Sequence, residues 1–329
     1  MRVACTRRML NLPLPQLRAS FKRITQVQSH QKSWIAGVKK DTWAGSWISE
    51  NIQSHADPTR WAEETANQAD LVIMFIHGGG FRIGYSTQYM DAFTCILERL
   101  KKTHGMSARI LSVDYGLSPE VSWPEARNDC IHAYRYLVHE LSVSPSRIIV
   151  AGDSAGGNLT ATTLLAIRDK SSDPALATLP SLPMPAGSIM ISPWTTLEDT
   201  SPTYISNRAT DIITAAHLNA HVADYLPNMQ TMDTKAQEQL LRQPNISPLY
   251  ATFHGFCPTL IVCGEGEIFR HDIEKLVKQL EHDQVKVDVL TRQGAPHIWI
   301  LMRALATTEE AWLEDLGKLT EWCVTTVTQ

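Results

Sequence analysis

From residue 70 onward, short aliphatic runs alternate with longer stretches in which apolar residues recur at helical spacing. The short runs are rich in Val, Ile and Leu with little polar alternation, as expected for strands buried on both faces. These runs cover Leu71–His77, Arg109–Tyr115, Arg147–Gly152, Ser188–Ser192, Thr259–Gly264 and Val285–Thr291. The helical stretches cover Thr87–His104, Pro124–Glu140, Gly157–Lys170, Asp272–Asp283 and Glu309–Val324. Repeated β-α-β units with right-handed crossovers predict an α/β fold, with a mainly parallel central sheet flanked by helices.

One interval, residues 195–250, interrupts this alternation because it is far longer than the usual connection between two strands. It contains helical patches at Ala215–Tyr225 and Thr234–Arg242, which predict an inserted cap. We therefore expect a cap or helical region at 1–45, a core at 46–194 and 251–329, and a cap insertion at 195–250. The tryptophan-rich start of the chain is expected to pack beside the insertion and help roof a pocket, with ordinary core packing as an equal alternative.

Composition excludes several classes of protein. Of the 329 residues, 43% are hydrophobic and 19% charged, which is unlike a disordered chain. The net charge of −4 offers no overall positive field for nucleic acid. The longest unbroken apolar run, Leu71–Ile76, is far shorter than the ~20 residues of a membrane-spanning helix. The six cysteines have no metal-site spacing, so we expect reduced, mostly buried thiols and no bound metal.

Charge is distributed unevenly along the chain. Residues 1–40 contain nine Lys or Arg and no acidic residue, so the remainder carries 30 − 9 = 21 basic and 34 acidic residues. Such a start is typical of a mitochondrial transit peptide, but it also fits a pair of N-terminal helices resting on the acidic body. We expect a cytoplasmic protein, with mitochondrial targeting left open. The sequence also leaves open whether copies of the chain form a homo-oligomer.

The segment Gly152–Gly156 has the pattern G-x-S-x-G, with Ser154 at its centre. It follows a predicted strand and precedes a predicted helix, the context in which a sharp turn raises a serine hydroxyl above a sheet. The start of a helix also places favourable N–H dipoles near negative charge that forms there. This context predicts a nucleophilic serine. Asp153 is too close along the chain to share a histidine with Ser154, so we expect it to stabilise the turn.

A second signal is the run of three glycines after His77. Consecutive glycines are unfavourable in backbone entropy, so a need for exposed N–H groups explains them better than local propensity. The amides of Gly78, Gly79 and Gly80, with that of Ala155, are therefore expected to bind an oxyanion. A phosphate-binding loop would require spacings that are absent here. His77 itself is expected to be a structural anchor.

With these two motifs, the chain resembles the hormone-sensitive-lipase-like branch of the α/β-hydrolases, whose members carry an HGGG box and a GDSAGG nucleophile turn. The stretch 112–126 is similar to the family's connection between the boxes, although Gly116 stands where arginine is usual. The resemblance implies an α/β-hydrolase fold and a serine hydrolase that needs no cofactor. A weaker resemblance links the chain to esterases of fungal secondary metabolism.

A serine nucleophile requires a base and a residue that orients the base. His297 follows the last predicted strand, where a loop can bring its ring over the sheet edge, and it also matches the family's histidine position. Matching the family motif after strand 259–264 assigns the acid to Glu267, where most relatives have aspartate. Asp272 is the alternative acid, although a helix-capping role suits it better. Phe81, Trp194, Ile298 and Trp299 flank the motifs and are candidates for substrate contacts, with core packing as the alternative.

These residues predict a serine carboxylesterase acting on small or medium ester substrates through an acyl-enzyme. An amidase, formamidase, lactonase or acyltransferase would use the same triad, and the sequence does not separate them. A small-molecule receptor on the same scaffold is disfavoured, because Ser154 and His297 are both present.

Overall fold

A computed structural model of the chain describes residues 2–169 and 181–328, and its centre is a single sheet of eight strands. The strands are β1 (Ile35–Lys39), β2 (Ala44–Ile48), β3 (Leu71–Ile76), β4 (Ala108–Asp114), β5 (Ile148–Asp153), β6 (Gly187–Ile191), β7 (Thr259–Gly264) and β8 (Val287–Arg292). Their order across the sheet is β1-β2-β4-β3-β5-β6-β7-β8. Strands β3 to β8 are parallel to one another, whereas β2 pairs antiparallel with both β1 and β4. The predicted mainly parallel α/β sheet is confirmed.

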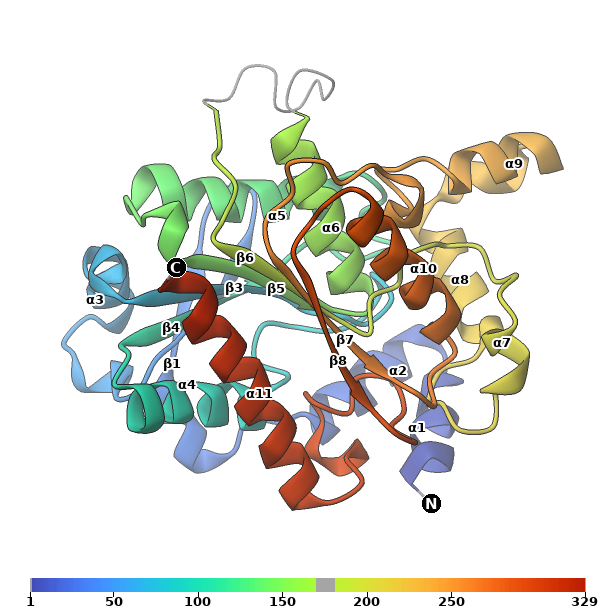
Figure 1. Cartoon of the computed structure of the whole chain (residues 1–329). Helices are drawn as coiled ribbons and strands as arrows, with labels where there is room; N and C mark the ends of the chain where they lie inside the picture. The colour runs from blue at the N-terminus through green and yellow to red at the C-terminus, as the bar shows by residue number, and fades with distance from the viewer. Residues whose placement is uncertain (1, 170–180, 329) are drawn as a thin grey trace.

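Helices cover both faces of this sheet (Figure 1). They are α1 (Arg2–Leu10), α2 (Leu14–Ile24), α3 (Pro58–Glu64), α4 (Met90–His104), α5 (Glu125–Arg135), α6 (Ala155–Arg168), α7 (Thr203–Ser206), α8 (Ala215–Tyr225), α9 (Thr234–Leu241), α10 (Arg270–His282) and α11 (Glu309–Val327). All the helical stretches expected from the sequence are present, including both patches of the insertion. The expected end of one helix at Lys170 lies outside the described residues.

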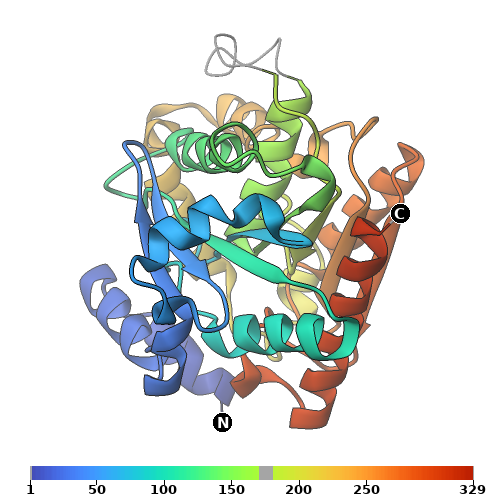
Figure 2. The ribbon, with the colours of Figure 1, turned by 90° about the vertical axis from the view of Figure 1, so that its left-hand side faces the viewer.

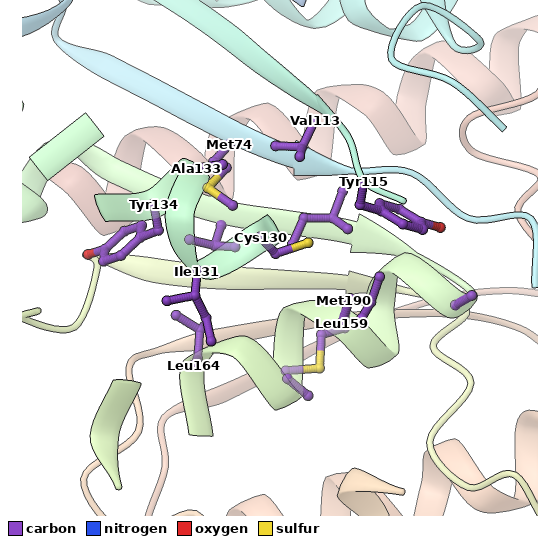
Figure 3. Packing of buried hydrophobic residues seen from close by; sticks show 14 of the residues in the cluster. Met74, Val113, Tyr115, Cys130, Ile131, Ala133, Tyr134, Leu159, Leu164 and Met190 are labelled. Atoms are coloured by element: carbon purple, nitrogen blue, oxygen red, sulfur yellow. The ribbon is translucent and has the colours of Figure 1, made fainter. Parts of the chain in front are cut away.

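The sheet separates two hydrophobic layers, because successive residues of a buried strand point to opposite faces. Met74 of β3 packs in the layer of α5 and α6, whereas its neighbour Ile73 packs in the layer of α4 and α11. Figure 2 shows the two helical layers on either side of the sheet, and Figure 3 shows the packing against α5 and α6 from close by. The residues labelled there are Met74, Val113, Tyr115, Cys130, Ile131, Ala133, Tyr134, Leu159, Leu164 and Met190.

Strands β1 and β2 were not expected from the sequence, and they cross the expected boundary at residue 45. Strand β1 lies inside the segment expected to be cap, yet residues 35–39 pair with residues 44–48 in the sheet. Both strands are only five residues long and contain glycine, which weakens the strand signal. If the division into core and cap is kept, its first boundary falls before residue 35.

Helices α1 and α2 lie beside the insertion, near α7 and α8 (Figure 1). The Arg7 guanidinium of α1 donates to the backbone oxygens of Arg208 and Asp211. In addition, Nε2 of His217 on α8 lies 2.8 Å from Oδ1 of Asn11. The N-terminal helices are thus attached to the segment that connects β6 to β7, and this attachment shapes the site described next.

Candidate active site

The sequence-predicted residues lie at one edge of the sheet, because each follows the carboxyl end of a parallel strand. Gly79 and Gly80 come after β3, Ser154 after β5, Glu267 after β7 and His297 after β8. Carboxyl ends of neighbouring parallel strands share an edge, and ligands of open α/β sheets bind there. Ser154, His297, Gly79 and Gly80 line the same cavity.

Ser154 occupies the strained turn that the G-x-S-x-G pattern predicts. Its backbone has φ 52° and ψ −118°, and it immediately precedes α6. Strain of this kind costs about 1–3 kcal/mol and persists only where the surroundings enforce it. Here the Ser154 N–H donates to Ile191 O at 2.9 Å, and the Ser154 carbonyl accepts from Trp194 N at 3.0 Å. A Cβ at Gly156 would lie 2.0 Å from the Ile76 oxygen, so only glycine allows α6 to begin this close to β3.

Glu267 and His297 form a buried hydrogen-bonded pair. Glu267 Oε2 lies 2.9 Å from His297 Nδ1, and Glu267 Oε1 accepts from Gly264 N at 2.6 Å. Burial opposes protonation of the imidazole, but the hydrogen bond that its Nδ1–H donates to Glu267 and the nearby carboxylates outweigh burial and raise the pKa of His297 above its usual value. The alternative acid, Asp272, does not cap a helix but lies inside the first turn of α10, where Ser201 donates to its carboxylate.

The loop formed by Gly78, Gly79 and Gly80, called the glycine loop below, differs from expectation at its first position. The N–H of Gly78 donates to Asp153 Oδ1 at 2.8 Å, so this amide is engaged within the protein and does not face the cavity. Asp153 also accepts from the Tyr89 hydroxyl at 2.7 Å, and burial raises the pKa of its carboxyl to about 6. Asp153 therefore ties the nucleophile turn to the glycine loop.

The three other amides of the expected oxyanion site keep suitable positions. Gly79 and Gly80 line the cavity, and Ala155 is the first residue of α6, where N–H groups have no partner within the helix. His77 stacks on Tyr115 with ring centroids 4.4 Å apart, and its Nδ1 lies 2.8 Å from Gly78 O. These contacts fit the structural role expected for His77.

Asp211 is a site residue that the sequence did not reveal. Its carboxylate is fully buried and accepts backbone N–H groups from the two loops that carry His297 and Glu267: His297 N at 3.0 Å and Ile268 N at 2.7 Å. It also accepts from Ile212 N at 2.6 Å, and burial raises its pKa to about 6. Asp211 comes from the insertion between β6 and β7, and no motif marks it. Only the folded chain shows that this insertion holds the loops of Glu267 and His297 together.

Helices α1 and α2 and the insertion line the cavity over Ser154. The cavity measures about 70 Å³. Its lining is mainly apolar and includes Met9, Leu10, Phe21, Ile24, Leu218 and His221. The expectation that the start of the chain roofs a pocket holds for α1 and α2, although the tryptophans of that region are not among the lining residues.

Of the four expected substrate contacts, only Ile298 lines the cavity. Phe81 stacks on Tyr225 at 3.8 Å between ring centroids, and Trp194 stacks on Phe269 at 5.9 Å. The Trp299 indole donates to Asp315 Oδ2 at 3.0 Å. These three rings are almost fully buried, so their position beside the motifs reflects core packing.

Within residues 2–169 and 181–328, no group of three or more His, Cys, Asp or Glu side chains is arranged to hold a metal ion. In the same part of the chain, no helix combines the length and apolarity required to cross a bilayer. Four of the six cysteines, Cys130, Cys257, Cys263 and Cys323, are buried with free thiols.

Comparison with known proteins gives the family. The profile of the α/β-hydrolase fold family matches residues 73–301. An esterase of Acinetobacter venetianus is 30% identical over 228 residues, covering 68% of this chain and 67% of that protein. The hormone-sensitive lipase of Bos taurus is 36% identical over 109 residues, which cover 32% of this chain and 14% of the lipase.

Among solved structures, an esterase from the bacterial hormone-sensitive lipase family superposes with a TM-score of 0.77. It is 22% identical, and the match covers 99% of this chain and 97% of the other. At that identity the likeness concerns the fold, and it agrees with the sheet order described above. The chain therefore belongs to the α/β-hydrolase fold family, in its hormone-sensitive-lipase-like esterase branch.

Proposed function

We propose that the protein hydrolyses carboxylic esters of small substrates through an acyl-enzyme formed on Ser154. The observation that carries the proposal is the buried Glu267–His297 pair, whose imidazole lines the same cavity as Ser154 and the glycine loop. A serine with its ordinary pKa is a poor nucleophile, and enzymes usually activate it with an adjacent, oriented base. The esterase and lipase names of the relatives support the same reaction.

In the proposed mechanism, Ser154 Oγ attacks the ester carbonyl while His297 Nε2 takes the hydroxyl proton. Glu267 holds Nδ1–H, fixes the tautomer and stabilises the imidazolium. The amides of Gly79, Gly80 and Ala155 stabilise the oxyanion of the tetrahedral intermediate. His297 then returns the proton to the leaving alcohol. Water, activated by the same imidazole, attacks the acyl-enzyme and releases the acid, so the net reaction consumes one ester and one water.

The size of the cavity supports a small acyl group. A cavity of about 150 Å³ in another protein accommodates benzene, and the cavity here is about 70 Å³. The site as folded therefore favours acyl groups of a few carbons. We also propose that α1, α2 and residues 195–250 act together as the cap. A cytoplasmic location is supported by the free thiols of all six cysteines.

The test is a panel of p-nitrophenyl acetate, butyrate and octanoate, the corresponding anilides and a γ-lactone, assayed with the wild type and Ser154→Ala. We expect ester hydrolysis that falls from butyrate to octanoate and a loss in kcat of at least about 10⁴-fold in the variant. Ser206→Ala, an exposed serine of the insertion, is the matched control and should keep wild-type rates. Faster turnover of anilides or the lactone than of any ester would overturn the proposed bond specificity. Wild-type activity in Ser154→Ala would overturn the mechanism.

A further inference from the structure

Residues 207–214, the segment between α7 and α8, hold the loop of the proposed acid. The segment forms neither helix nor strand, so its contacts with the rest of the chain determine its position. The side-chain amide of Asn207 donates to Glu267 O at 2.9 Å, and the hydroxyl of Thr210 donates to Gly266 O at 2.7 Å. The 207–214 segment is therefore fastened along the loop that carries Glu267.

Within this segment, Asp211 binds both loops of the proposed pair with its carboxylate and binds α1 with its carbonyl. The carboxylate accepts the N–H groups of Ile268 and His297. The carbonyl oxygen of Asp211 accepts from Nε of Arg7 at 2.7 Å and also from Nη2 of Arg7. Nη2 donates in addition to Arg208 O at 2.5 Å. One guanidinium of α1 thus holds two carbonyls of the segment that supports the base.

The helix that carries Arg7 also contributes to the lining of the cavity over Ser154. Met9 and Leu10 lie two and three residues after Arg7 on α1, and both line that cavity. An ester bound beside Ser154 therefore packs against α1. Through Arg7 and Asp211, the same helix is connected to the backbone of the residue that acts as the proposed base.

An arginine is well suited to this connection. Its planar guanidinium presents several N–H groups in a fixed arrangement, whereas a lysine ammonium is a compact charge at the end of a flexible chain. Hydrogen bonds from a charged donor are also stronger than hydrogen bonds between neutral groups. Arg7 is therefore expected to fix the 207–214 segment more firmly than lysine or glutamine would.

We propose that Arg7 is a positioning residue, which acts through Asp211 to couple the packing of α1 against the substrate to the placement of His297. The inference rests on the proposed function, because it concerns the base of the same site. A misplacement of about 1 Å caused by a distant mutation can lower a rate about 10²-fold. Since Arg7 acts through one intervening residue, its loss should lower kcat by roughly 10- to 100-fold.

Single variants of the N-terminal segment separate positioning from simple attachment of α1. In p-nitrophenyl butyrate hydrolysis, Arg7→Gln should lose kcat as stated above, and Arg7→Lys should keep part of it. Arg8→Gln is the matched control, because Arg8 is the exposed neighbour on the same helix, and it should retain wild-type kcat and KM. Asn11→Ala removes another attachment, since Asn11 Oδ1 lies 2.8 Å from His217 Nε2 on α8. Its effect should be confined to KM.

A double-mutant cycle tests whether Arg7 acts through Asp211. Asp211→Ala removes the carboxylate that binds the two loops but keeps the carbonyl that binds Arg7. In this background, Arg7→Gln should lower kcat less than twofold, because the connection to His297 is already broken. Residues that act independently would give effects that add, whereas residues in one chain of contacts do not. Thermal unfolding shows which variants are folded at the assay temperature.

The pH profile of kcat/KM is a second readout, which does not require the Asp211 variant. Burial lowers the pKa of His297, but the hydrogen bond to Glu267 and the charges of Asp211, Glu267 and Asp153 raise it above its usual value. A loop that is held less firmly weakens the hydrogen bond to Glu267. The acid limb should therefore move to lower pH in Arg7→Gln and stay in place in Arg8→Gln and Asn11→Ala.

Four outcomes overturn the inference while leaving the proposed function intact. They are a wild-type kcat in folded Arg7→Gln, a change confined to KM with an unmoved acid limb, an equal loss of kcat in Asn11→Ala, and effects of Arg7→Gln and Asp211→Ala that add. In contrast, failure of the wild type to hydrolyse every ester, together with failure of Ser154 to react with an organophosphate, would refute the proposed function itself.

Discussion

Replacing Glu267 by aspartate tests how closely the acid is fitted to His297. Aspartate is the acid that the resemblance in the sequence leads us to expect at this position, so by that resemblance alone the change looks conservative. The structure predicts otherwise. Glu267 Oε2 lies 2.9 Å from His297 Nδ1, and removal of one methylene retracts the carboxylate by ~1.5 Å. The gap becomes ~4.4 Å, beyond hydrogen-bond reach.

The same substitution has a second consequence. Glu267 Oε1 accepts from Gly264 N at 2.6 Å, and the shorter side chain leaves this buried N–H without its partner at a cost of about 1–3 kcal/mol. A misplacement of about 1 Å in a catalytic constellation can lower the rate about 10²-fold. We therefore expect Glu267→Asp to lower kcat by ~10²-fold. Glu267→Gln keeps the length of the side chain but removes its negative charge, so the kcat of this variant should fall further, by ~10⁴-fold.

The assay is p-nitrophenyl butyrate hydrolysis as a function of pH, with Glu265→Asp as a control that shortens another glutamate of the same loop. The hydrogen bond that His297 donates to Glu267 raises the pKa of His297, and the base must be unprotonated to act. The acid limb of kcat/KM should therefore have its midpoint above 6.5 in the wild type and move to lower pH in Glu267→Asp. Wild-type kcat and an unmoved acid limb in Glu267→Asp would refute the conclusion that the shorter aspartate side chain cannot hydrogen-bond His297.

Two further predictions concern the residues around the triad. Gly80→Ala requires a side chain at φ 61° and places its Cβ 1.7 Å from His221 Nδ1. We expect a loss of ~10²-fold or more in kcat; a folded variant with wild-type kcat would show that the loop is not held as described. Asp211→Asn removes a carboxyl whose pKa burial raises to about 6 from 3.8. The stabilisation that a raised carboxyl pKa provides is present at pH 4 and is lost as pH rises through 6. The unfolding free energy of the wild type minus that of the variant should therefore fall by up to ~3 kcal/mol between pH 4 and 7. A difference that does not change with pH, measured by urea denaturation, would contradict the burial of an ionisable group there.

The parallel part of the fold was predictable because strands β3 to β7 are buried along nearly all of their length and have continuous aliphatic sequences. Strand β8, at the edge of the sheet, is largely exposed, contrary to the burial expected for it. Residues 259–264 form a strand within the limits that the sequence indicates. Strands β1 and β2 were missed because each has only five residues and includes glycine. Their identity as strands depends on pairing with each other and with β4, which is a tertiary property.

The candidate site shows the same contrast between residues with a local sequence signal and residues that only tertiary contacts reveal. The positions of Ser154, Glu267 and His297 could be inferred because local motifs mark strand ends, and the fold brings those ends together. Gly78 looked equivalent to its neighbours, but its amide is occupied by Asp153, which the linear pattern does not show. Asp211 and the lining from α1 and α2 come from segments without motifs. Their contribution arises from long-range contacts such as that between Arg7 and the Asp211 carbonyl.

The central claim is that Ser154, the Glu267–His297 pair and the glycine loop converge on one reacting carbonyl. The most direct measurement is a crystal structure of the protein after reaction with diethyl p-nitrophenyl phosphate. We expect phosphorus bonded to Ser154 Oγ, with the phosphoryl oxygen ~2.7–3.1 Å from the amides of Gly79, Gly80 and Ala155. An unmodified Ser154 in active protein, or a phosphoryl oxygen directed away from these amides, would contradict the account.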